Sequence, residues 1–422
     1  MKLHTILFAL IALPVVAEPL TLDECVRVAL EQHPSYAAAN AAADAARESV
    51  GVARAAFYPT LAADAAYRRF ETHVFLPKGL PFAFDPVVGP IDDWSGGVDV
   101  RYTLYDHGAR RAELAGARAA HASAGAGSEA TREQIVFAVH DAFYRLAAWM
   151  ASGEAAAERL QRAEAHVALA QARLDAGAVP PVDVIRARTV AANARLVIAN
   201  TRAATDVARG ALNAAMGRPA ETPLEIAPSS ESIPAVDVEA AIQGALQQRP
   251  EARAAREKEA VQRARVGLAQ SAFGPKARVT AGYGVRDSVF VPRDPDWYAA
   301  INLDVPLFDG NATRHRVAAA NAEVRRQEAE TAAVLNAIRQ EVWSTGATLQ
   351  QRREAVVAAE AARREAGEAV RLATARYDAG AGTINDLLDA EAALLEADTQ
   401  IVRARFEEQT AYAAFRKAAG VK

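Results

Sequence analysis

The fold is decided by one short stretch of sequence, Trp94–Leu104, which reads WSGGVDVRYTL. Its even-numbered positions carry Trp, Gly, Val, Val, Tyr and Leu, whereas its odd-numbered positions carry Ser, Gly, Asp, Arg and Thr. Alternation with a period of two predicts a β-strand that has one apolar and one polar face. Most of the remaining chain is rich in Ala, Glu and Arg and predicts helix, so the apolar face needs a partner that the surrounding sequence does not supply.

Composition excludes several classes of protein. The chain has 422 residues, a net charge of −4, 51% hydrophobic residues and only 6% aromatic residues. Alanine therefore carries much of the apolar content, which favours closely packed helices. The net charge and the absence of a long basic run argue against a partner nucleic acid. A single cysteine leaves no intramolecular disulfide.

The N-terminus predicts export. Lys2 is followed by an apolar run over Ile6–Leu13 and by small residues that end at Ala17. This order predicts a secretory signal peptide over residues 1–17, the alternative being a short buried helix. No later run of apolar residues is long enough for a transmembrane helix.

The mature chain contains two copies of one unit. Pro34 aligns with Pro250 (250 − 34 = 216), and Trp94 aligns with Trp297 (297 − 94 = 203). The first copy therefore has 216 − 203 = 13 extra residues, in a Pro- and Gly-rich segment after Tyr67 that predicts a loop. We predict repeat 1 over 18–218, a linker over 219–235 and repeat 2 over 236–422. Such duplication favours one duplicated structural unit over two independent domains.

Each copy contains the same predicted elements. The strands are expected at about 60–69, 94–104, 276–286 and 297–307, the long helices at about 108–176 and 311–379, and the return helices at about 182–216 and 384–419. A helix of roughly 68 residues is about 100 Å long. Helices of this length pack side by side as coiled-coil-like pairs, where Ala permits close approach.

The four strands have the pattern of membrane strands. Their polar faces carry Asp and Arg, each strand has about 9–11 residues, and aromatic residues gather near the strand ends, as in a membrane barrel. The predicted aromatic girdle consists of Tyr67, Trp94, Tyr102, Tyr283, Trp297 and Phe308. The alternative is a sheet that packs on helices. Because unpaired strand edges cannot face lipid, four strands must be completed by further copies of the chain.

These features together resemble the TolC-like outer-membrane efflux proteins. The likeness covers the whole mature chain and rests on several short motifs in a fixed order. They are the leading pattern at Leu20, Leu22, Ala29, Leu30 and Pro34, the YPTL step at Tyr58–Leu61, the LFDG step at Leu307–Gly310 and the repeated ARxDAG turns.

The resemblance implies a mainly helical fold with a β part. Three chains form a 12-stranded β-barrel in the outer membrane of a Gram-negative bacterium, joined to a periplasmic α-helical barrel. The implied function is an exit duct for a tripartite efflux pump or a type I secretion system. Its partners are a periplasmic adaptor, an inner-membrane transporter of the RND, ABC or MFS type, and outer-membrane lipid. Neither catalysis nor a cofactor is expected, and no catalytic motif appears.

The turn YDAGAGTINDLLDA, Tyr377–Ala390, carries the candidate gate. The resemblance implies that Asp386 and Asp389 face the pore axis, where carboxylates from three chains bind cations. The alternative for Asp386 is a capping box with Thr383 at the start of the return helix. Tyr377 matches a latch position of the family, but Gly382 stands where an arginine of that latch is expected.

Three residues of the first copy complete the predicted latch. Arg186 and Arg188 are candidate substitutes for the missing arginine, and Asp183, the counterpart of Asp386, is a candidate partner for them. The two hairpin turns are predicted adaptor-docking points, marked by Gly177, Pro181, Gly380 and Thr383. The rival interpretation of the whole chain is a soluble periplasmic coiled-coil scaffold or pump adaptor.

Overall fold

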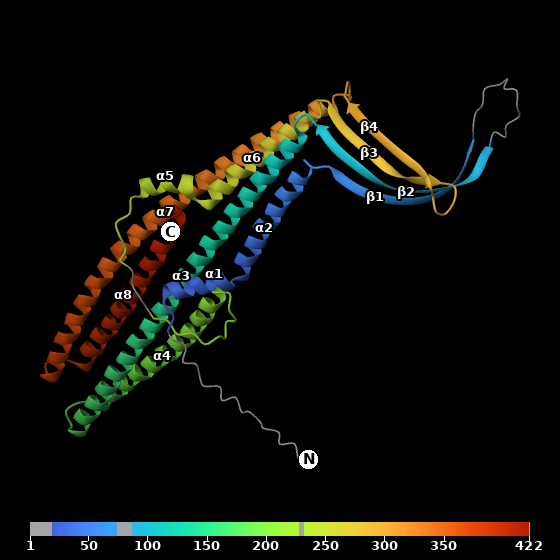
Figure 1. Cartoon of the computed structure of the whole chain (residues 1–422). Coiled ribbons are helices and arrows are strands. Elements are labelled where there is room, and N and C mark those ends of the chain that lie inside the picture. Colours follow the sequence, from blue (N-terminus) through green and yellow to red (C-terminus); the bar gives the residue numbers. More distant parts are fainter. Residues whose placement is uncertain (1–18, 74–86, 228–231, 422) are drawn as a thin grey trace, which may run out of the picture. The chain divides into compact units, whose positions relative to one another are not determined.

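A computed structural model describes residues 19–73, 87–227 and 232–421 (Figure 1). The signal peptide predicted over 1–17 lies outside the described residues. The chain divides into two compact units. The helical unit comprises Met1–Asn40, Gly127–Ala252 and Leu335–Lys422, and the sheet unit comprises Ala41–Ala126 and Arg253–Val334.

Helices dominate both copies of the repeat. The first copy contains α1 (Leu22–Gln32), α2 (Pro34–Ala55), β1 (Thr60–His73), β2 (Val87–Tyr105), α3 (Ala109–Asp175) and α4 (Pro181–Ala215). The second contains α5 (Val238–Gln248), α6 (Pro250–Ser271), β3 (Lys276–Asp287), β4 (Asp294–Asp304), α7 (Ala312–Asp378) and α8 (Ile384–Ala419). Among the described helices, none is both long enough and apolar enough to cross a membrane.

The four strands form one antiparallel sheet in the order β1-β2-β3-β4 (Figure 1). Its central pair joins the two copies, because β2 of the first lies against β3 of the second, with Val98 opposite Tyr283. Leu61 lies opposite Val100 in the first hairpin, and Tyr283 lies opposite Trp297 in the second. The register therefore brings the apolar positions of all four strands to one face, as their alternation predicts.

The strand ends differ from the sequence-based expectation. β1 continues to His73 and β2 begins at Val87, so part of the segment predicted as a loop is strand. Pro90 is accommodated because the register between Phe70 and Thr72 shifts, which places Gly89 and Pro90 opposite one residue of β1. β3 pairs with β2 only from Trp94 onward, so the missing amide of Pro90 costs no bond on that side. In the second copy β4 ends at Asp304, three residues before the predicted end.

The duplicated LYD and LFD motifs begin the two long helices. Asp106 accepts hydrogen bonds from the amides of Gly108 and Arg110, at 3.2 and 3.1 Å. Asp309 accepts bonds from the amide and hydroxyl of Thr313, at 2.7 and 2.5 Å. Both carboxylates therefore satisfy amides that the first turn of a helix leaves without partners.

The core of the helical unit lies where α1 crosses α3 and α4. Phe143, Leu212 and Met216 are fully buried there together with Cys25. Gly217 ends α4 in the left-handed region, with φ 77°, and a Cβ at this position lies only 2.8 Å from the Cα of His33. The end of α4 thus lies against the junction of α1 and α2, and only glycine allows the two backbones to come this close.

Two glycines with nearly the same φ provide a test of this packing. Gly177 has φ 73° but a Cβ there meets no atom within 4 Å. Gly177→Ala is expected to lower the free energy of unfolding by about 1–2 kcal/mol, the cost of a left-handed backbone. Gly217→Ala is expected to cost more, because the methyl group also displaces the backbone at His33. The midpoints of thermal unfolding, followed by circular dichroism, compare the two variants, and equal shifts contradict this account.

Candidate functional site

The apolar face of the sheet is exposed in the single chain. Trp297, Ile301 and Leu303 are 70, 74 and 67% exposed, and Tyr283 on the neighbouring strand is 69% exposed. These side chains lie on one face, because Tyr283 pairs with Trp297 and Val279 pairs with Ile301. A continuous apolar surface of this kind marks a surface that another phase or another chain covers.

The opposite face is polar and carries charged groups in defined pairs. Arg286 donates two hydrogen bonds to Asp93, at 2.7 and 2.8 Å, and Tyr298 donates one to Asp99 at 2.6 Å. The missing side chain of Gly282 leaves room for the Tyr298 ring, since a Cβ added at this position would lie 2.5 Å from both the ring and the Asp99 carboxylate. The polar face therefore carries charged and polar side chains that pair with one another across the strands.

The structure places the predicted aromatic girdle at several levels of the sheet. The Tyr67 and Trp94 rings are 4.3 Å apart, and Tyr102 lies opposite Val279. The expectation that Tyr67 and Trp94 stand at a strand end is wrong, because β1 and β2 both continue past them. Phe308 lies beyond the end of β4 and is 84% exposed.

The two outer strands have open edges. Within the described residues, β1 pairs only with β2 and β4 pairs only with β3. The outward amides and carbonyls of both strands are thus available to further strands. An open edge together with an exposed apolar face is a combination that a soluble sheet avoids.

α3 and α4 form one helical hairpin and α7 and α8 form the other, and the turns at their ends, the hairpin tips, have the same backbone structure. Gly177 and Gly380 are left-handed, with φ 73° and 71°. The amide of the following alanine bonds back to the carbonyl of Arg173 at 2.8 Å in the first tip and of Arg376 at 2.9 Å in the second. This helix cap requires a left-handed residue, which explains why both copies repeat the glycine of the motif R-x-D-A-G. Pro181 begins α4 and Thr383 caps α8 on the far side of each turn.

Arg173 joins the two hairpin tips, a contact that the sequence did not indicate. Its guanidinium lies 4.2 Å from the centroid of the Tyr377 ring, donates to the Tyr377 carbonyl at 3.0 Å and reaches Asp378 at 3.3 Å. Tyr377 is buried in a small core with Ile384 and Leu387. Its hydroxyl has no hydrogen-bond partner among the described residues. The only signal available was that Arg173 and Arg376 align in the repeat.

The two gate candidates have different environments. Asp386 forms the capping box that was the alternative explanation, accepting from the Thr383 amide at 3.0 Å, while the Asp386 amide donates to the Thr383 hydroxyl at 3.2 Å. The hydrogen bonds that the Asp386 carboxylate accepts from Thr383, first of all from its amide, lower the pKa of the carboxyl. Asp389 is exposed one turn further along α8. Asp386 therefore has a structural role of its own, whereas Asp389 has none that the described contacts explain.

The predicted pairing of Asp183 with Arg186 or Arg188 does not occur within the described chain. Arg186 donates to the side chain of Asn385 at 2.8 Å, and Arg188 donates to Gln171 at 3.1 Å. Arg186 thus connects α4 to α8, and it adds a second contact between the hairpins near the one that Arg173 makes. Among the described residues, no cluster of His, Cys, Asp or Glu has the form of a metal site.

A buried carboxylate lies between α3 and α8, above the tips. Glu391 is 8% exposed, and its carboxylate lies 3.3 Å from the His166 ring and 3.5 Å from the Arg162 guanidinium. The hydrogen bond to His166 and the nearby charges hold the pKa of Glu391 below its usual value, against the effect of burial. Glu391 and His166 are 225 positions apart in sequence, so no local pattern predicted their contact.

Known proteins share the duplicated organisation of this chain. Residues 25–218 and 241–421 match the family described as "Outer membrane efflux protein", and the two ranges follow the two repeats. Protein CyaE of Bordetella pertussis is 28% identical over 410 residues, which cover 96% of this chain and 84% of that protein. The resemblance inferred from the sequence motifs is thereby confirmed.

Solved structures share the fold. The outer membrane protein VceC of Vibrio cholerae aligns with a TM-score of 0.79 and 24% identity, over 95% of this chain and 96% of that chain. The outer membrane channel MtrE of Neisseria gonorrhoeae, solved in its open state, aligns with a TM-score of 0.79 and 22% identity, over 95% and 89% of the two chains. The predicted fold class is confirmed by these alignments.

The Glu391 contact predicts an acid-sensitive part of the stability. A carboxyl whose pKa is depressed by folding contributes stability above its unfolded value, near 4.5, and loses it as the pH falls further. Glu391→Gln is therefore expected to unfold at a lower temperature than the wild type at pH 7, and the difference is expected to shrink between pH 4.5 and 3. Thermal unfolding measured across this range tests the expectation. Glu354→Gln, an exposed acid on α7, is the matched control, and a pH-independent difference for Glu391→Gln contradicts the assignment.

Proposed function

The chain belongs to the outer membrane efflux protein family, and from this premise we propose that it is an exit duct in the outer membrane of a Gram-negative bacterium. Cargo passes through it passively, driven by an inner-membrane transporter to which a periplasmic adaptor connects it, in a tripartite efflux pump or a type I secretion system. The long helices form its large periplasmic part. The family consists of transport proteins, and the duct itself catalyses nothing.

The open-edged sheet carries this proposal. In lipid, every backbone amide and carbonyl must find a partner within the protein, so the free edges of β1 and β4 require further strands. Three copies of a four-stranded sheet supply 3 × 4 = 12 strands, which close around a passage, whereas eight strands leave an interior that side chains fill. A homotrimer, which the family resemblance implies, meets these requirements with an apolar outer face and a polar inner face.

A soluble coiled-coil scaffold or pump adaptor is the second candidate. It accounts for the long helices, but it leaves the apolar face with Trp297, Ile301 and Leu303 in water. It also leaves two strand edges without partners. The exposed apolar face therefore favours the membrane duct.

The tips supply the proposed gate and docking sites. Asp386 and Asp389 of three chains form a ring of carboxylates at the periplasmic entrance, where they bind cations. Tyr377 and its partner Arg173 secure the closed tip, together with Arg186 and the nearby Asp183. The turns at Gly177–Pro181 and Gly380–Thr383 are the proposed contacts for the adaptor.

Two neighbouring alanines on β4 test the proposed orientation of the sheet. Ala299 lies on the apolar face opposite Ala281, and Ala300 lies on the polar face opposite Thr280. Ala299→Lys places a charge in lipid, which costs about 2–4 kcal/mol per chain at mid-membrane. We expect it to reduce the amount of oligomer recovered from outer-membrane fractions. Ala300→Lys is the matched control and is expected to assemble normally; similar recovery of both variants refutes the orientation.

Conductance measurements test the gate. Asn replaces Asp386 and Asp389 better than Ala does, because its amide oxygen still accepts the capping bond from Thr383. We expect the double Asn variant to need at least about tenfold more of a multivalent cation for half block, since 1.4 kcal/mol of lost attraction corresponds to that factor. Single channels in planar bilayers provide the measurement. Glu396→Gln, on α8 beyond the tip, is the control, and unaltered block in the double variant removes the gate from the proposal.

A further inference from the structure

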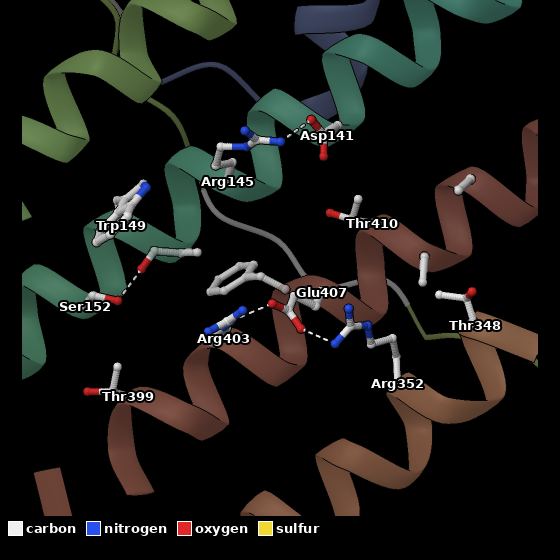
Figure 2. A pocket seen from close by; sticks show the side chains of 14 residues that line it. Asp141, Arg145, Trp149, Ser152, Thr348, Arg352, Thr399, Arg403, Glu407 and Thr410 are labelled. Atoms are coloured by element: carbon white, nitrogen blue, oxygen red, sulfur yellow. Dashed lines mark hydrogen bonds and ion pairs between the residues drawn. The ribbon is translucent and has the colours of Figure 1, made fainter. Parts of the chain in front are cut away.

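A groove with a volume of about 640 Å³ lies in the helical unit between α3 and α8, and α7 closes one side of it (Figure 2). α3 contributes residues between Asp141 and Ser152, α8 contributes residues between Thr399 and Ala414, and α7 contributes Thr348 and Arg352. None of the proposed gate, latch or docking residues lines the groove.

The floor of the groove is apolar. Trp149 of α3 and Phe406 of α8 supply aromatic surface, and Trp149 is 39% exposed. Small side chains such as Ala148, Ala411 and Ala414 leave the two helices apart and create the space. A concave apolar surface with a few charged groups at its border is the usual composition of a small-molecule site.

The charges at the border do not balance. Arg145 pairs with Asp141 at 2.7 Å. Glu407 accepts from two guanidinium groups, from Arg352 at 2.5 Å and from Arg403 at 2.6 Å (Figure 2). Three arginines and two carboxylates give the groove an excess of 3 − 2 = +1 charge.

Of the three groove arginines, Arg403 has the most exposed side chain. A guanidinium has five N–H donors, and the Arg403 bond to Glu407 uses its Nε. The Arg403 side chain is 77% exposed, so its remaining donors are accessible. These donors stand at the border of an apolar surface. A ligand can therefore place its apolar body on that surface while its carboxylate accepts hydrogen bonds from the guanidinium.

We propose that this groove binds an amphiphilic carboxylate. Its aromatic or alkyl body lies on Trp149 and Phe406, and its carboxylate accepts hydrogen bonds from Arg403, neutralising the excess charge. An uncharged amphiphile of the same shape lacks this bond, and a cationic one meets repulsion. Because the ligand contacts α3 and α8 together, its binding holds the two hairpins at a fixed distance. The site does not depend on the proposed duct function.

Energy transfer from Trp149 to 1-pyrenebutyrate tests the proposal on the purified full-length protein in amphipol. We expect saturable quenching of tryptophan emission with a matching rise of pyrene emission. All proteins carry Trp343→Phe, because Trp343 of α7 lies only five residues before Thr348 of the groove and would itself transfer energy to the probe. In this background Trp149→Phe keeps the aromatic floor and is expected to remove the saturable part of the signal. Persistence of that part in Trp149→Phe locates the probe elsewhere and overturns the proposal.

Charge variants test the carboxylate contact. Arg403→Gln removes the proposed contact and is expected to weaken binding of 1-pyrenebutyrate about tenfold, the value of one charge-assisted hydrogen bond. Arg352→Gln removes the excess charge from another helix but keeps that contact, and is expected to weaken binding less. Glu407→Gln releases both guanidinium groups and is expected to tighten binding. Arg405→Gln is the matched control, since Arg405 also lies on α8 but bonds Glu360 outside the groove.

The uncharged analogue 1-pyrenebutanol distinguishes recognition of the carboxylate by Arg403 from binding through the apolar body alone. We expect it to bind the wild type about tenfold more weakly than 1-pyrenebutyrate, and equally well to the wild type and to Arg403→Gln. Equal affinity of the wild type for the alcohol and the carboxylate shows that the arginines do not recognise the ligand. Unchanged carboxylate affinity in Arg403→Gln leads to the same conclusion.

Discussion

The pairing of backbone amides and carbonyls at the edges of the sheet is the constraint on which this molecule depends. A single chain provides four strands, and the outer edges of β1 and β4 have no partner in the described residues. Neither a longer hairpin nor a different register removes these edges, because four strands are too few to close on themselves. Only closure by further copies satisfies the backbone in lipid. The apolar face has the same need, since no described part of the chain covers Trp297, Ile301 and Leu303.

Duplication explains how one chain builds matched halves. The same local devices recur in both copies: a carboxylate that caps the long helix at Asp106 and Asp309, and a left-handed glycine that ends it at Gly177 and Gly380. The copies differ where they meet other elements. Arg249 is buried and bonds Glu251 and Glu341, whereas its counterpart in the first copy is His33. Local geometry is thus repeated, while the contacts between elements are specific to each copy.

Sequence patterns predicted what depends on near neighbours in the chain. Period-two alternation gave the correct faces of all four strands, because the pleat alone determines them. The extension of β2 to Val87 was missed because Pro90 and its neighbouring glycine are typical of loops, and a bulge at a sheet edge tolerates them. The contacts of Arg173 and Glu391 were missed for a different reason. Each joins helices from different copies, and neither helical spacing nor composition specifies which residues of two long helices lie side by side.

The contacts within the helical unit divide into two chemical kinds. Each hairpin has an apolar core, at Val184 and Ala187 between α3 and α4 and at Ile401 and Ala404 between α7 and α8, with ion pairs beside it. Near the tips the two hairpins are joined by polar contacts, through Arg173, Arg186 and Glu391. Separating apolar surfaces exposes them to water, whereas a polar contact is exchanged for hydrogen bonds to water, at a net cost of about 1.5–3 kcal/mol where one partner is charged. The contacts near the tips are therefore of the kind that water can replace, whereas the apolar core of each hairpin is not.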